Sequence, residues 1–193
     1  MKNIMKIAGW IDLINIGIGK ISIWMIFAAT AISAGNALVR YIFGIGSNAF
    51  LEVQWYLFAA VFMLGAGYGF LHNVHVRIDV LASRLSDRTR NWIDIGGVIV
   101  FLLPFCAMMI YMGVPLLDRA YVSGETSFSP GGLIRWPIYA LIPVGFALLA
   151  LQGLSELAKR VNYLFFDGVD VLNYEHEANQ KRDKIEAEAR DAA

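Results

Sequence analysis

The ionisable side chains that could carry chemistry stand at the edges of long apolar runs. Glu52 precedes one such run, and His72 and His75 follow it, close to Arg77 and Asp79. Histidines on facing helices could ligate haem, and an acid inside a membrane span could carry a proton or a cation. Here the two histidines share one segment, and the apolar runs contain no ionisable residue. The sequence therefore argues against a haem-bearing redox anchor and against an autonomous proton-coupled pump.

Other residues that commonly take part in catalysis or metal binding form no recognisable pattern. Cys106, the one cysteine, lies inside an apolar run and has no Cys or His at metal-ligand spacing. The sequence has no P-loop, no zinc motif and no nucleophile–base pair. Its 16 Lys and Arg residues balance 16 Asp and Glu residues, so no basic excess indicates a nucleic-acid partner. We expect no enzyme activity, no cofactor and no metal site.

The composition indicates a protein of the lipid bilayer. Of the 193 residues, 58% are hydrophobic and 17% are charged, whereas a soluble domain is nearer half apolar and a quarter charged. Four charge-free runs are long enough to cross a ~30 Å hydrocarbon layer at ~1.5 Å per residue. The runs cover residues 21–39, 53–71, 95–117 and 136–155. We predict an all-α membrane protein with one four-helix transmembrane domain over 1–160 and a charged tail over 161–193.

The polar segment over 72–94 predicts an amphipathic helix along the membrane surface, between the second and third spans. Its apolar residues recur on one helical face. These residues are Val74, Ile78, Leu81 and Leu85. Ser86 followed by Asp87 is typical of an N-cap, so the third membrane helix should begin there.

The N-terminal segment over 1–20 has isoleucines at helical spacing, which predicts an interfacial helix leading into the first span. A secretory signal peptide is an alternative, with Lys2 and Lys6 as its basic region and a cleavage site near 29–31. Residues 118–135 predict a loop, because a turn cluster lies within this range.

Lysine and arginine are unevenly divided between the two sides of the membrane. The segments before the first span, between the second and third spans and after the fourth span carry most of them. The opposite segments carry Arg40, Arg119 and Arg135. The richer side should be cytoplasmic, which places both termini inside the cell.

Three blocks of residues together resemble a known transporter family. They are E-V-Q-W-Y at 52–56, H-V-R-I-D-V-L at 75–81, and P-G-G-L-I-R-W-P-I at 130–138. With them the chain resembles, over about 20–160, the small membrane subunit of tripartite ATP-independent periplasmic (TRAP) transporters, the DctQ-like family.

The resemblance implies a bacterial inner-membrane subunit that works with two partners. A large TRAP membrane subunit carries the Na⁺ and substrate sites, and a periplasmic substrate-binding protein delivers the substrate, usually an organic acid. The small subunit serves as a scaffold. Residues expected to contact the large subunit are Glu52, Gly65, Gly69, Arg77 and Asp79. Residues expected, from topology alone, to help dock the periplasmic protein are Arg40, Asp118, Arg119, Glu125 and Arg135.

A stand-alone four-helix exporter of drugs or cations is the alternative function. Such exporters depend on an acidic residue in their first span. The run over 21–39 has none, which favours the transporter subunit.

Overall fold

The computed structural model describes residues 2–72, 86–130 and 132–166, whose regular elements are helices. The elements are α1 (Lys2–Phe43), α2 (Asn48–Leu71), α4 (Asp87–Gly97), the π-helical turn η1 (Val98–Leu102), α5 (Leu103–Ser123) and α6 (Trp136–Phe166). Four stretches are long and apolar enough to cross a membrane: α1, α2, the continuous run from α4 to α5, and α6. The prediction of an all-α protein with four transmembrane helices is confirmed. The amphipathic helix predicted between the second and third spans lies mostly over 73–85, outside the described residues.

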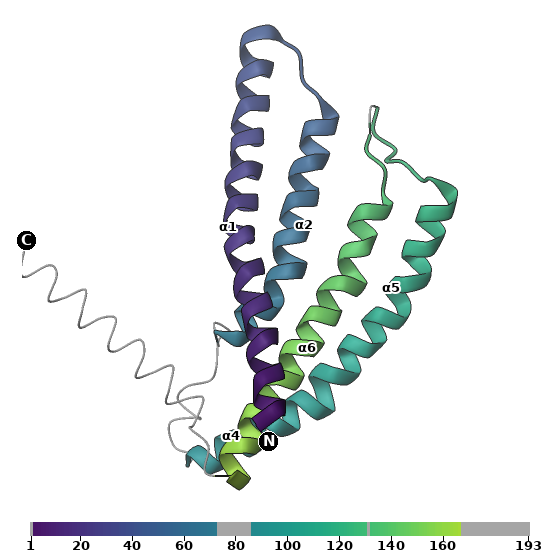
Figure 1. Ribbon diagram of the computed structural model, residues 1–193. Helices are drawn as coiled ribbons and strands as arrows, with labels where there is room; N and C mark the ends of the chain where they lie inside the picture. Colours follow the sequence, from purple (N-terminus) through teal and green to yellow (C-terminus); the bar gives the residue numbers. More distant parts are fainter. Residues whose placement is uncertain (1, 73–85, 131, 167–193) are drawn as a thin grey trace, which may run out of the picture.

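Helix α6 is the centre of the bundle, because it packs against α1, α2 and α5. Figure 1 shows α1 and α2 as one antiparallel pair and α5 and α6 as the other. The α1–α2 turn and the α5–α6 connection lie at one end of the molecule. The N-terminus, α4 and the last turns of α6 lie together at the opposite end (Figure 1). We call these the hairpin end and the N-terminal end.

Helix α1 is one continuous helix of 42 residues, so the segment over 2–20 leads into the first span without a break, and its place at the membrane interface stays a prediction. At ~1.5 Å per residue the whole helix is about 63 Å long, roughly twice the hydrocarbon thickness. The first turns of α1 pack against α6. The side-chain oxygen of Ser155 on α6 donates a hydrogen bond to the carbonyl of Ala8, at 3.3 Å.

The third membrane helix begins at Asp87 as predicted, with Ser86 as its N-cap, because the Ser86 side chain accepts a hydrogen bond from the Thr89 amide. Pro104, which lacks an amide hydrogen, stands in the first turn of α5, two positions after the end of η1, and the third membrane helix has a widened turn just before it. The span ends at Ser123, before Gly124 in the left-handed conformation (φ 61°). The loop predicted over 118–135 is therefore shorter, and its first residues belong to α5.

Close approach of α2 and α6 depends on Gly145. A Cβ atom on this residue would lie 2.7 Å from the Met63 carbonyl oxygen, which is backbone and cannot move aside cheaply. We expect Gly145→Ala to lower the free energy of unfolding by about 1–3 kcal/mol, because the helices must move apart. Thermal denaturation in detergent micelles measures the loss. Gly17→Ala is the matched control, since nothing lies within 4 Å of its Cβ position; equal midpoints for the two variants would contradict close packing at Gly145.

Candidate functional site

An ionic cluster fills the N-terminal end of the bundle between α1, α4 and α6. Its members are Asp12 and Asn15 of α1, Asp94 of α4, and Gln152, Ser155, Glu156, Lys159 and Arg160 of α6. Arg160 lies at its centre and is 2% exposed. The guanidinium is 2.7 Å from Oε2 of Glu156 and 3.1 Å from Oδ2 of Asp94. One arginine thus joins α6 to α4 across 66 residues of sequence.

A second set of contacts in this cluster joins α6 to α1. The Lys159 ammonium lies 2.7 Å from Asp12 and 2.7 Å from Glu156. Asp12 also accepts hydrogen bonds from Gln152 at 2.9 Å and from Ser155 at 3.0 Å. Asp12 is therefore the polar anchor of α1 on α6.

The cluster continues inward as a neutral pair. Asn15 donates a hydrogen bond to the Gln152 side chain at 2.8 Å, and both residues are fully buried. The Asn15 carbonyl oxygen lies against Gly67 of α2, where an added Cβ would collide with it. A small residue at position 67 lets α2 join the same assembly. The Asn15 amide nitrogen is paired with Gln152 and the Ile11 carbonyl, whereas the buried Asn15 carbonyl oxygen has no hydrogen-bond partner among the described residues.

Spacing along α6 could have revealed this cluster from the sequence. Its polar residues recur at i, i+3, i+4 and i+7, on one face of the helix. They are Gln152, Ser155, Glu156 and Lys159. These residues were not among the predicted site residues, because the fourth charge-free run ends at residue 155, just before Glu156. Asp12 could not be matched to Lys159 from local pattern, because the two residues are 147 positions apart.

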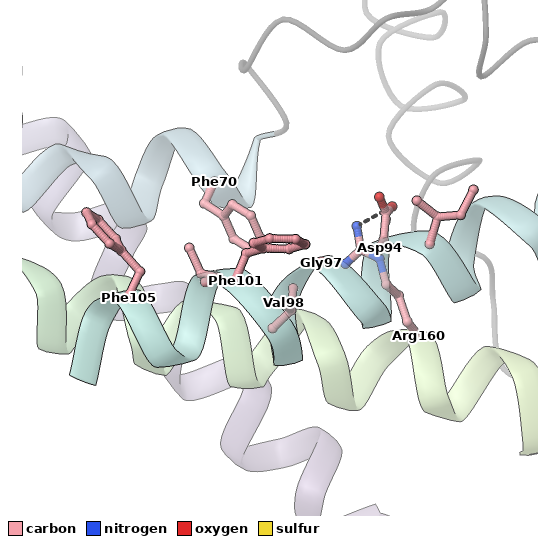
Figure 2. Close-up of a pocket in the computed structure, with 9 residues that line it drawn as sticks. Phe70, Asp94, Gly97, Val98, Phe101, Phe105 and Arg160 are labelled. Atoms are coloured by element: carbon pink, nitrogen blue, oxygen red, sulfur yellow. Dashed lines mark hydrogen bonds and ion pairs between the residues drawn. The ribbon is translucent and has the colours of Figure 1, made fainter. Parts of the chain in front are cut away.

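An apolar cavity of about 560 Å³ opens beside the ionic cluster. Figure 2 shows Phe70, Val98, Phe101 and Phe105 along it, and the Asp94–Arg160 pair at one end. The π-helical turn η1 supplies part of this wall. Among the described residues no group of three or more His, Cys, Asp or Glu side chains could hold a metal ion.

A hairpin made of residues 124–130 and 132–135 connects α5 to α6 at the hairpin end. Thr126 and Ile134 form an antiparallel bridge, and the Ser127 amide donates a hydrogen bond to the Leu133 carbonyl at 2.9 Å. Glu52 of α2, which is 5% exposed, accepts a hydrogen bond from the Leu133 amide at 2.7 Å. The Glu52 carboxylate therefore fixes the hairpin to α2.

Two weaker hydrogen bonds support this attachment. The Tyr56 hydroxyl donates to the Ile134 carbonyl at 3.2 Å, and the Asn48 side-chain amide donates to the Pro130 carbonyl at 3.4 Å. Three residues of α2 therefore form hydrogen bonds with the hairpin.

Arg135 and Glu125, two residues expected to dock a periplasmic protein, are brought together at the base of the hairpin. Their side chains form an ion pair at 2.8 Å. The Arg135 guanidinium also lies 4.7 Å from the centre of the Phe128 ring. Burial alone would lower the pKa of Arg135, but hydrogen bonds to Tyr139 and Glu125 raise it above its ordinary value. Arg135 is a permanent positive charge on this hairpin.

The other expected docking residues lie apart from the hairpin tip. Asp118 and Arg119 are exposed on α5, and Arg40 is exposed in the last turn of α1. No described contact joins these residues to the Glu125–Arg135 pair. The sequence analysis missed Phe128, because a single aromatic residue in a loop carries no pattern.

The residues expected to contact a large subunit fall partly outside the described part of the chain. Arg77 and Asp79 lie within 73–85 and are not described. Gly65 and Gly69 lie on α2, and a Cβ at Gly65 would be 3.9 Å from the Ser22 side chain of α1, an ordinary contact. Their role toward a partner stays a prediction.

Comparison with known proteins decides the family. A family model described as "Tripartite ATP-independent periplasmic transporters, DctQ component" matches residues 29–162, more than half of the chain. The chain belongs to this DctQ family. The resemblance seen in the three sequence blocks is confirmed, and the chain is a multi-pass membrane protein.

Two relatives carry the name C4-dicarboxylate TRAP transporter small permease protein DctQ. The one from Rhodobacter capsulatus is 29% identical over 125 residues, which cover 65% of this chain and 54% of the relative. The one from Vibrio cholerae is 24% identical over 186 residues, covering 86% of this chain and 78% of the relative. The chain therefore spans about half the length of the R. capsulatus relative. Neither relative nor the family model supports a stand-alone exporter.

Proposed function

We propose that this DctQ-family chain is the small, non-catalytic membrane subunit of a Na⁺-coupled TRAP transporter for organic acids. It lies in the bacterial inner membrane with both termini in the cytoplasm. It holds the large membrane subunit in place and helps to dock the periplasmic substrate-binding protein. The Na⁺ and substrate sites belong to the large subunit.

The ionic cluster is the observation that carries the scaffold role. Its charged groups join α1, α4 and α6 by contacts of 2.7–3.1 Å. Removing one charged partner from such a buried group strongly destabilises the fold. We therefore expect these helices to move as one unit. A frame that keeps its shape is suited to bracing a partner that moves.

The outer faces of the membrane-spanning helices supply the contact area. Large apolar side chains are exposed on these faces, including Trp24 of α1 at 72%, Phe62 of α2 at 80%, Phe101 of η1 at 74% and Tyr111 of α5 at 80%. In a bilayer these faces meet lipid or another membrane protein. We place the large subunit on a part of this surface, with Gly65 and Gly69 of α2 as small residues that let another helix approach.

Co-purification in mild detergent tests this proposal. The tagged chain, expressed with the membrane proteins of its native host, is expected to recover a much larger polytopic subunit in about equal amount. Arg77→Glu or Asp79→Lys is expected to reduce that recovery, because either reversal removes the charge we assign to subunit contact. Quantitative mass spectrometry of the eluate provides the measurement.

Arg88→Glu is the matched control, since Arg88 is exposed on the first turn of α4 and belongs to the same side of the membrane. It should recover the partner as the wild type does. Recovery of the chain alone, in a homogeneous state that moves a cation across liposome membranes, would overturn the proposal.

A further inference from the structure

An exposed aromatic ring stands near the tip of the hairpin. Phe128 is 90% exposed, the highest value among the large hydrophobic side chains of the described residues. The Arg135 guanidinium covers only a small part of the ring. A single exposed apolar side chain is common on protein surfaces, so the residues around Phe128 decide what the ring can bind.

Lipid is not the expected partner of Phe128, because the hairpin extends past the ends of α5 and α6 (Figure 1). Tyr121 near the end of α5 and Trp136 at the start of α6 form an edge-to-face ring pair, with centroids 5.7 Å apart. Such amphipathic rings favour the membrane–water boundary. Figure 1 shows the hairpin projecting past both helix ends, away from the N-terminus. We therefore expect Phe128 to face water rather than the hydrocarbon core.

The hairpin holds Phe128 in a fixed position. Glu52 binds the opposite strand at Leu133, and the Ser127 amide, next to Phe128, is bonded across the hairpin to the Leu133 carbonyl. A side chain that is already ordered loses little conformational freedom when it binds. An aromatic anchor with a polar rim is also the usual centre of a protein interface.

The rim of this surface carries both signs of charge. Arg135 and Glu125 are paired beside the ring, and neither side chain is fully buried. The complementary surface is an apolar socket bordered by polar groups of both signs, on a water-soluble protein. On the hairpin end, which we assign to the periplasm, the soluble partner of a TRAP system is the substrate-binding protein.

We propose that Phe128 is the anchor through which the hairpin binds the periplasmic substrate-binding protein. This inference rests on the proposed function. It assigns the docking role in that function to Phe128 and the charged residues around it. Arg135 positions the ring by stacking on it and takes part in the rim. Of the five residues expected to dock this partner, Glu125 and Arg135 are the two that lie beside the anchor.

The test uses the complex of this chain with its large subunit, reconstituted in nanodiscs, and the purified substrate-binding protein of the same system. Biolayer interferometry measures the affinity. Phe128→Ala is expected to weaken binding about tenfold or more, the size typical of a central aromatic anchor. Phe128→Trp, which keeps an aromatic anchor, is expected to bind much more tightly than Phe128→Ala. Phe166→Ala, which removes an exposed ring at the end of α6, on the opposite end of the bundle, should bind as the wild type does.

The outcomes separate this inference from the proposed function. If the complex assembles and Phe128→Ala binds the soluble protein as tightly as the wild type, the anchor is wrong and the scaffold stands. If Phe128→Ala instead loses the large subunit, the ring contacts that subunit and the inference fails. If the wild-type complex does not assemble, the proposed function fails and this inference fails with it.

Discussion

Replacing Arg160 with methionine is expected to lower the free energy of unfolding by about 3–5 kcal/mol. The guanidinium is 2% exposed and contacts the carboxylates of Glu156 and Asp94. Methionine fills a similar volume but leaves Glu156, which is 1% exposed, without its arginine partner. Glu156 keeps Lys159 at Oε1, but its buried Oε2 loses its cationic partner, and leaving that oxygen unpaired costs free energy. The thermal midpoint in detergent micelles measures the loss.

A double variant separates lost charge pairing from lost packing. Glu156→Gln combined with Arg160→Met removes the stranded carboxylate as well, so it is expected to be more stable than Arg160→Met alone. Lys6→Met, at an exposed position on α1, controls for the loss of one positive charge elsewhere. Arg160→Met with a wild-type midpoint would show that the ionic cluster does not hold the bundle together.

The same cluster shows why the helices could be predicted and their assembly could not. A run of apolar residues as long as the bilayer is a local property, so the four spans follow from composition and length. The first span was expected to start near residue 21, because Asp12 and Lys20 interrupt the apolar run. Helix α1 continues through these positions, since Asp12 is paired with Lys159 of α6. A charge satisfied by a distant residue looks unsatisfied in the local sequence.

For the α5–α6 connection, too, the position could be predicted from local sequence, but the attachment to α2 could not. The turn cluster near Pro130 predicted a connection between the last two spans, and Gly124 marks where that connection begins. Glu52 was a candidate for contact with the large subunit, whereas Glu125 and Arg135 were candidates for docking from topology alone. Their shared location depends on a hydrogen bond between Glu52 and the Leu133 amide, 81 residues apart. No spacing rule covers such a pair, because it exists only after α2 and α6 have packed.

Glu52→Ala is expected to free the hairpin while leaving the bundle intact. The Leu133 amide then loses its acceptor, and its hydrogen exchange is expected to become about tenfold faster or more, because a bond to a charged group is lost. Hydrogen–deuterium exchange with mass spectrometry, on peptides that cover 126–135, measures the change. Gln54→Ala, two positions along α2, is the control and should leave exchange in the hairpin unchanged. Equal exchange at Leu133 in Glu52→Ala and wild type would mean that the hairpin keeps its shape without Glu52.

The comparison of Glu52→Ala with Phe128→Ala then tests how the hairpin works. Phe128→Ala removes the anchor, whereas Glu52→Ala keeps the anchor and lets it move. If the fixed position of Phe128 matters, Glu52→Ala should also weaken binding of the substrate-binding protein, but by less than Phe128→Ala, since only the ordering of the hairpin is lost. Subunit assembly should be unchanged in both variants, because the ionic cluster lies at the other end of the bundle. A loss of assembly in Glu52→Ala would instead place Glu52 in the contact with the large subunit, the role that its sequence block implies.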